Sequence, residues 1–575
     1  MSQNNEPKDR FNVTDIAKPF DIRCDIKMAM VPMRDGVKLH TAIYFPPDFQ
    51  GKAPVIMARS PYTRTNYFEL PHADALKHKC ISIMQACRGS GWSEGGMFYP
   101  VDDDSEKNDI EDLFQWLSQQ DWFDGRCVMY GGSYPGWMQW CAQRSGFKGL
   151  VAVSPRVAPI RQCSGAASRC GVPKLRFPIN WNLFMFHRRT YGFANLPALG
   201  KLGAFSHLPA IEADKFIYGK EIKHFRDFLQ RAEKPAEFFD GYQSWFKDFR
   251  APAFISGGWF DMFKDDVLES FRLMRDNAAT EEARKFTRLT FGPWAHGGLV
   301  NPEYFGAENN YTELLKREEK FLFGLLEDPS KDPLGAEDPI VKFFMLGENR
   351  WYNASDWPPP GVKEFSMYLH SNGNANTSGG DGTISAELPG AEEPDHYVST
   401  PENPVTAGVE TEPVGCYDRS EVEKRSDVLV YTTKVFTEPF TLTGKVKLKF
   451  SAKASTIDTD FFATLTDVLP DGRSMLLTIG GVRARYRNGL EKEEFLTPGE
   501  ICTYEINLGD IAVKFPAGHA MRLTIHGQEF PLYERNANNG HVPFKAAKLY
   551  NSACTIYHDA EHPAELKLPV NAEIC

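Results

Sequence analysis

The chain has 575 residues, of which 42% are hydrophobic and 25% charged, and it carries a formal net charge of −11 at pH 7. A chain of this length needs more than one hydrophobic core, so two or three domains are expected. The mild negative charge argues against nucleic acid as a partner, and the lack of long apolar runs argues against a membrane-spanning segment.

The first ten residues are polar, so we expect no signal peptide there. The eleven cysteines fall largely in predicted strands and helices, for example at Cys80, Cys127 and Cys141, where cysteine behaves as a small buried hydrophobe. These features predict a reduced, cytoplasmic protein. Neither a Cys-x-x-Cys nor a His-Glu-x-x-His spacing is present, so we expect no metal, and nothing indicates an organic cofactor.

Up to about residue 155, strand-like and helix-like runs alternate, as they do in doubly wound parallel sheets. Residues 55–58 are predicted to form an early buried strand, with residues 59–62 as the loop that follows it. Residues 109–117 carry apolar side chains at helical spacing and predict a crossover helix.

The stretch 127–137 predicts a strand, a sharp turn with Ser133 at its tip, and a helix. This is the pattern of a nucleophile elbow, in which the serine adopts a strained backbone and its neighbours must be small. Gly131 stands two residues before the serine. Pro135 occupies the position two residues after it, where a small residue is usual, and Gly136 follows. By itself the pattern also fits an ordinary glycine-rich loop between a strand and a helix.

From about residue 156 to 250 strand-like runs disappear, and segments such as 219–229 are amphipathic, which predicts a helical insertion. Two predicted strands follow, at 253–256 and 289–291. Asp261 and His296 each come shortly after one of them, behind a glycine. The order Ser133, Asp261, His296 is that of the α/β-hydrolases. The alternative is that Asp261 caps the helix beginning near Asp265 and that His296 is a loop histidine.

A serine nucleophile also needs donors for the oxyanion that forms on the substrate. The backbone amide of Tyr134, at the start of the predicted helix, is one candidate. The second should come from the loop after the early strand, where the Tyr62 hydroxyl is available. Because the loop that carries Asp261 should line the pocket, Phe263 and Trp259 are predicted to contact the substrate.

Beyond residues 371–381, which are rich in Ser, Asn and Gly, the pattern changes to alternating β runs, for example at 427–431, 446–450 and 521–525. Such runs separated by turns predict a β-sandwich.

Several motifs in this order resemble the bacterial cocaine esterase/X-Pro dipeptidyl-peptidase family, which includes α-amino acid ester hydrolases and glutaryl cephalosporin acylases. They lie at residues 33–37, 60–62, 88–95, 131–136, 258–261, 292–296, 458–461, 470–473 and 515–519. The resemblance implies Ser133, Asp261 and His296 as the catalytic triad. It also implies Tyr62 as an oxyanion donor beside the Tyr134 amide.

The resemblance further implies an α/β-hydrolase catalytic domain over 1–155 and 251–365, a helical cap over 156–250 and a C-terminal jelly roll over 366–575. A homodimer is expected from the family. The chain departs from the family at Ala86, where an aspartate is frequent, and this puts a local ion pair in doubt. It also has Phe263 and Lys264 where the amino-ester hydrolases place carboxylates.

These observations predict a serine hydrolase that cleaves small carboxylic esters or amides through an acyl-enzyme. One alternative is an X-Pro dipeptidyl-peptidase or a glutaryl/cephalosporin acylase. Another, from a different class, is a non-catalytic carbohydrate-binding protein. Phe263 offers apolar surface and no charge for an ammonium group, so uncharged acyl groups are expected to be preferred. Lys264 leaves open a preference for a substrate carboxylate.

Overall fold

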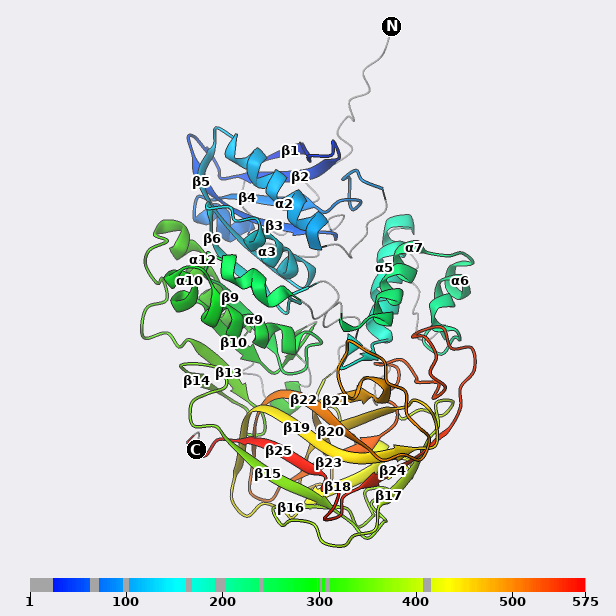
Figure 1. Cartoon of the computed structure of the whole chain (residues 1–575). Coiled ribbons are helices and arrows are strands. Elements are labelled where there is room, and N and C mark those ends of the chain that lie inside the picture. Colours follow the sequence, from blue (N-terminus) through cyan, green and yellow to red (C-terminus); the bar gives the residue numbers. More distant parts are fainter. Residues whose placement is uncertain are drawn as a thin grey trace.

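The computed structural model describes residues 24–62, 72–96, 103–161, 168–191, 203–236, 241–296, 298–299, 302–305, 311–406 and 415–573. Figure 1 shows three parts: a sheet flanked by helices, a group of helices set to one side, and a β structure that follows them in the sequence. The predicted fold class is confirmed: an α/β part, a helical insertion and a β-rich C-terminal part.

The first sheet has ten strands in the order β1-β2-β4-β3-β5-β6-β9-β10-β13-β14. The strands from β4 to β13 are parallel to their neighbours, and the outer strands β1, β2 and β14 are antiparallel. Their bounds are β1 Asp25–Pro32, β2 Lys38–Phe45, β3 Ala53–Ser60, β4 Ile81–Ala86, β5 Phe123–Gly132, β6 Leu150–Arg156, β9 Phe254–Gly258, β10 Arg288–Gly292, β13 Val341–Met345 and β14 Arg350–Ala354.

Helices cover both faces of this sheet (Figure 1). Side chains of β5 alternate between two apolar clusters: Cys127 and Met129 join the cluster that contains α2, α3 and α9, whereas Val128 and Tyr130 join the one that contains α12. This alternation is expected for a strand that is buried on both faces. The helices of this part are α1 His72–Lys77, α2 Asp103–Ser118, α3 Tyr134–Arg144, α9 Lys264–Asn277, α10 Glu281–Phe286, α11 Pro302–Phe305 and α12 Tyr311–Glu327.

Two of the predicted elements begin or end elsewhere than the sequence suggested. β3 continues through Arg59 and Ser60, which pair with Gln85 and Ala86 of β4, so the loop begins only at Pro61. Arg59 was predicted to lie in the loop, but it is fully buried in the strand and ion-paired with Glu106 of α2. In the insertion, Gly219 has φ 67° and ends α6, so the amphipathic helix predicted over 219–229 is α7, which begins only at Lys223.

The helical insertion packs around its own apolar cluster, which also takes in Phe263 from the first part and Phe544 from the C-terminal part. It therefore contacts both other parts of the chain. Its elements are β7 Ser168–Arg169, β8 Val172–Pro173, α5 Arg176–Tyr191, η2 Ala210–Glu212, α6 Ala213–Tyr218, α7 Lys223–Gln230, η3 Arg231–Glu233 and η4 Tyr242–Asp248.

The C-terminal part is an eleven-stranded β structure in the order β17-β24-β19-β25-β15-β16-β18-β23-β20-β21, with β22 paired to β19. It is hydrogen-bonded to the first part of the chain just after β13. The Leu346 amide donates to the Ala512 carbonyl of β22, and the Leu346 carbonyl accepts from the Lys514 amide. Its strands are β15 Lys363–His370, β16 Thr383–Ser385, β17 Asp395–Ser399, β18 Leu429–Thr433, β19 Phe440–Ala454, β20 Asp460–Val468, β21 Ser474–Arg483, β22 Cys502–Phe515, β23 Ala520–His526, β24 Ser552–Tyr557 and β25 Glu565–Val570, with the short helices η5 Val422–Lys424 and η6 Ala484–Tyr486.

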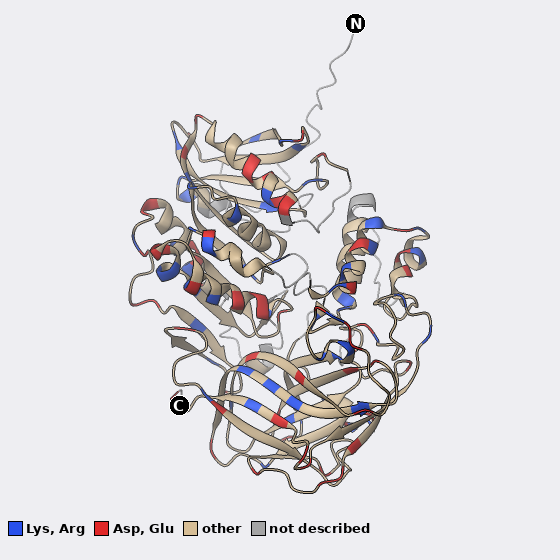
Figure 2. Ribbon diagram, viewed as in Figure 1, with Lys and Arg blue, Asp and Glu red and all other residues tan. Residues whose placement is uncertain are grey.

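Figure 2 shows basic and acidic residues interspersed along the visible helices and strands. Among the residues that the structure describes, no helix has the length and apolar character that crossing a bilayer would require.

Candidate active site

Ser133 is the single residue between β5, which ends at Gly132, and α3, which begins at Tyr134. Its backbone has φ 60° and ψ −123°, a left-handed conformation that residues with a side chain rarely adopt. Two backbone hydrogen bonds hold it: the Ser133 amide donates to the Arg156 carbonyl (2.8 Å), and its carbonyl accepts from the Trp137 amide (2.9 Å). The predicted strand–serine–helix turn is therefore present.

The glycine two residues before the serine is required by space as well as by backbone conformation. Gly131 has φ 130°, and a Cβ at this position would lie 2.7 Å from the Cβ of Pro135. Pro135 thus occupies the space that Gly131 leaves open. It lies in the first turn of α3, where the missing amide hydrogen costs no helical hydrogen bond. The proline that departs from the usual pattern is accommodated without disrupting the turn.

The three residues predicted as a triad form one hydrogen-bonded chain. His296 Nε2 lies 2.8 Å from Ser133 Oγ, and His296 Nδ1 lies 2.7 Å from Asp261 Oδ2. The Asp261 side chain is fully buried, whereas 23% of the His296 side chain is exposed. The other carboxylate oxygen, Asp261 Oδ1, accepts the backbone amide of Phe263 at 2.7 Å. Both oxygens are therefore engaged, and the carboxylate is fixed toward the imidazole.

The sheet topology explains why residues so far apart in sequence meet. β5, β9 and β10 are parallel and close together in the sheet, so the loops after them emerge at the same edge. The loops after β9 and β10 are also bound to each other: the amides of Trp259 and Phe260 donate to the carbonyls of Gly292 and Trp294. Gly258 permits this approach, because a Cβ there would lie 2.1 Å from the Trp294 carbonyl oxygen.

The two candidate oxyanion residues are neighbours in the structure. The Tyr134 amide is at the N-terminus of α3, and the rings of Tyr62 and Tyr134 are in edge-to-face contact at 6.4 Å. The Tyr62 hydroxyl accepts a hydrogen bond from the indole nitrogen of Trp181, on α5 of the insertion (2.8 Å). Because indole only donates, this bond uses a lone pair of the Tyr62 oxygen and not its proton.

Behind this corner lies a buried network that the sequence analysis missed. Tyr134 donates from its hydroxyl to Glu106 Oε1 (2.8 Å), and Glu106 Oε2 accepts from Arg59 (2.9 Å). Arg59 also donates to Gln85. Burial raises the pKa of the Glu106 carboxyl, although Arg59 opposes the shift, and burial raises the pKa of Tyr134. The network holds the side chain of Tyr134, the residue after Ser133, in the core.

A sequence signal for Glu106 does exist. Ile110, Leu113 and Leu117 form the buried stripe of α2, and Glu106 stands one turn before them on the same stripe. An acidic residue at a position expected to be apolar indicates a buried partner. Trp181 gives no comparable signal, because an aromatic residue on an amphipathic helix is most simply part of the core.

Phe263 lies against the triad, whereas Trp259 lies in the core. The Phe263 ring meets the His296 ring edge-on at 5.3 Å and the Phe177 ring of α5 at 6.1 Å. Trp259 donates from its indole nitrogen to the Phe344 carbonyl and packs between Phe291 and Trp357. A substrate contact remains a prediction for both residues.

The departure at Ala86 does not leave Arg88 without acidic partners. Arg88 forms ion pairs with Asp35 (2.7 Å) and with the buried Asp109 of α2 (2.6 Å). Two carboxylates from other segments thus provide an ion pair that the sequence comparison had put in doubt.

The strand order, the strained serine and its hydrogen-bonded histidine and aspartate define the molecule as a serine hydrolase with an α/β-hydrolase domain. The chain belongs to the X-Pro dipeptidyl-peptidase (S15) family: residues 35–298 match the model of that family, and residues 335–567 match that of the X-Pro dipeptidyl-peptidase C-terminal non-catalytic domain.

Known relatives match over nearly the whole chain. Cocaine esterase from Rhodococcus sp. (strain MB1 Bresler) is 32% identical over 587 aligned residues, which cover 94% of this chain and 97% of that protein. Among solved structures, an aminopeptidase from a marine sediment Thaumarchaeota archaeon matches with a TM-score of 0.81 at 22% identity and 99% coverage of both chains. An α-amino acid ester hydrolase matches with a TM-score of 0.76 at 21% identity, covering 98% of this chain and 100% of that one. The two structures support the fold alone.

Proposed function

We propose that this serine hydrolase cleaves carboxylic esters through an acyl-enzyme, with Ser133 as nucleophile, His296 as general base and Asp261 as the residue that orients the imidazole. The observation that carries the proposal is the continuous chain from Ser133 Oγ through His296 to Asp261, with bonds of 2.8 and 2.7 Å. These lengths are within the range required for proton transfer.

In the first step Ser133 Oγ attacks the ester carbonyl carbon while its proton moves to His296 Nε2. Nδ1 must then carry the hydrogen bonded to Asp261, and the aspartate stabilises the imidazolium that forms. The carbonyl oxygen becomes an oxyanion, for which the Tyr134 amide and the Tyr62 hydroxyl are the proposed donors.

Collapse of the tetrahedral intermediate expels the alcohol, which takes the proton from His296. Water then attacks the acyl-enzyme with the same base, and the carboxylic acid leaves. The bond from Trp181 supports the role of Tyr62, because it holds the phenol oxygen in place through a lone pair and not through the proton.

We further propose that uncharged, apolar acyl groups are preferred over α-amino acyl groups. The support is the edge of Phe263 against His296, flanked by Phe177, which gives the histidine an apolar neighbour at the reacting centre. A buried ammonium group facing these rings would be unpaired and therefore costly.

The direct test combines labelling with a substrate comparison. A fluorophosphonate probe should label wild-type protein and not the Ser133→Ala variant, which separates an enzyme from a carbohydrate-binding protein. A phenylacetyl ester should be cleaved with higher kcat/KM than a phenylglycine ester of the same alcohol. Labelling that persists in Ser133→Ala would contradict the assignment of the nucleophile, and faster cleavage of the amino ester would contradict the acyl preference alone.

A further inference from the structure

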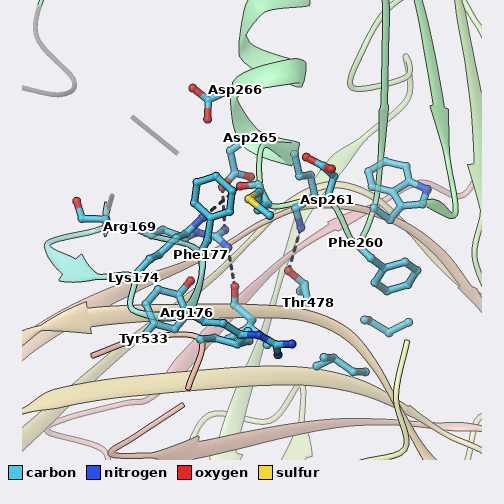
Figure 3. A pocket seen from close by; sticks show the side chains of 18 residues that line it. Arg169, Lys174, Arg176, Phe177, Phe260, Asp261, Asp265, Asp266, Thr478 and Tyr533 are labelled. Atoms are coloured by element: carbon cyan, nitrogen blue, oxygen red, sulfur yellow. Dashed lines mark hydrogen bonds and ion pairs between the residues drawn. The ribbon is translucent and has the colours of Figure 1, made fainter. Parts of the chain in front are cut away.

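A cavity of about 170 Å³ lies where the three parts of the chain meet, beside the loop that carries Asp261 (Figure 3). It is bounded by β7, by Lys174 and the start of α5, by residues 259–262 and 264–266, by β21 and by Leu532 and Tyr533. Of the proposed triad only Asp261 borders it. Phe177, which lines the cavity, contacts the ring of Phe263, which in turn contacts the ring of His296. Neither Ser133 nor His296 is among the residues that line it.

The walls combine apolar surface with an excess of cations. The apolar side chains include Phe177, Leu476, Ile479 and Leu532. The polar lining consists of Ser168, Arg169, Lys174, Arg176, Asp261, Lys264, Asp265, Asp266, Thr478 and Tyr533. Among these are four cations and three carboxylates.

Two of the three carboxylates are already engaged, one of them by a cation of the same cavity. Asp261 is held by His296, and Asp265 pairs with Arg169 at 3.0 Å. The third, Asp266, accepts the backbone amide of Ile160. With the Arg169–Asp265 pair set aside, three cations and two carboxylates remain, so the local balance favours an added negative charge.

Each lysine donates to a neutral acceptor, and the nearby carboxylate of Asp265 offsets only part of the cost of burying their ammonium groups. Lys264 is 6% exposed and donates to the hydroxyl of Thr478 at 3.0 Å; Lys174 donates to the Met262 carbonyl at 3.2 Å. Burial lowers the pKa of Lys264 to about 8, and burial together with the charge of Arg169 lowers the pKa of Lys174 to about 8. A bound anion would offset this desolvation.

We propose that this cavity is a second binding site, distinct from the space at Ser133, for a small carboxylate with an apolar body about the size of a phenyl ring. The size follows from the volume, because an apolar cavity of roughly 150 Å³ holds a benzene molecule. The carboxylate lies between Lys264 and Lys174, and the apolar body lies against Phe177 and Ile479.

The ligand would touch all three parts of the chain at once. Lys174 is bonded to the loop residue Met262, and Lys264 is bonded from the start of α9 to β21 of the C-terminal part. Occupancy therefore ties the loop of Asp261 to the β structure. This inference concerns the cavity and does not depend on the proposed ester cleavage.

The test is calorimetric titration of the full chain with phenylacetate after Ser133 has been blocked by a small phosphonate. Binding should persist in the blocked protein, and the neutral isostere phenylacetamide should bind at least about tenfold more weakly, because a charge-assisted hydrogen bond is lost. The Lys264→Met and Lys174→Met variants should each lose about tenfold in affinity. Lys331→Met, which removes an exposed lysine paired with Asp328, is the matched control and should bind like wild type.

Loss of phenylacetate binding on blocking Ser133 would overturn the proposal, since the anion would then occupy the substrate space. Wild-type affinity in both lysine variants would overturn it as well. If the phosphonate fails to react, the proposed nucleophile is in doubt, and the unblocked protein and its lysine variants still decide whether the cavity binds the anion. Because replacing a buried lysine by methionine keeps the volume of the side chain, a folded variant is expected, and its circular dichroism spectrum verifies this.

Discussion

Replacing Ser133 by glycine should make the protein inactive and at the same time more stable than replacing it by alanine. The reason is the backbone of Ser133, with φ 60° and ψ −123°. Holding a residue with a Cβ in such a sparsely populated region costs on the order of 1–3 kcal/mol, and glycine removes most of that cost. Glycine loses about 0.5–1 kcal/mol through its greater freedom in the unfolded chain.

The expected difference is therefore about 1 kcal/mol, within a range of roughly 0–2.5 kcal/mol, in favour of Ser133→Gly over Ser133→Ala. Both variants lose the bond from Oγ to His296, so that contribution cancels in the comparison. Equilibrium urea unfolding of the two variants, followed by circular dichroism, measures the difference. Equal slopes of the unfolding free energy against urea concentration would show that the two variants expose the same surface on unfolding. A glycine variant that is no more stable than the alanine variant would refute the idea that the turn stores strain.

Three further predictions concern the neighbours of the serine and the C-terminal part. Tyr62→Phe should lower kcat by roughly 10²–10³ with little effect on KM, the usual loss for one oxyanion donor; a change below about threefold in steady-state kinetics would assign Tyr62 a structural role. Glu106→Gln should destabilise the protein by about 3–5 kcal/mol in urea unfolding, because it leaves the fully buried Arg59 without its 2.9 Å carboxylate partner; a change under about 1 kcal/mol would show that Asp109, 3.6 Å from Arg59, compensates. In the C-terminal part burial opposes the charge on His558, but Asp395 and Glu392 outweigh it and raise the His558 pKa. The stabilisation by His558 should thus be present at pH values below the unfolded histidine pKa and be lost as pH rises through the raised value in the folded protein. Urea unfolding from pH 6 to 9 should show this loss in wild type and not in His558→Gln, and identical pH profiles would contradict the assignment.

Much of the fold could be predicted from the sequence because its signals are local. The period of apolar residues predicts α2, and the glycines around Ser133 predict the turn between β5 and α3. The places of Asp261 and His296 after two buried strands suffice to predict that they meet, since parallel strands bring their following loops to one edge of a sheet.

Other features depend on contacts between segments distant in sequence, and no local pattern reports them. Arg59 belongs to a strand because Glu106, 47 residues later, neutralises it. The Tyr62 hydroxyl is oriented by Trp181, which comes from the insertion, 119 residues away.

The sequence by itself determined the class of fold, the order of the three parts and the residues of the proposed triad, because strand periodicity, turn glycines and chain order are properties of short segments. Only the tertiary structure decided which side chains pack in the core and which lie at the site. Trp259 and Phe263 stand four residues apart, yet the first packs in the core and the second lies against His296. The cationic cavity likewise exists only where the three parts of the chain meet, because none of them alone brings Lys174, Lys264 and Thr478 together.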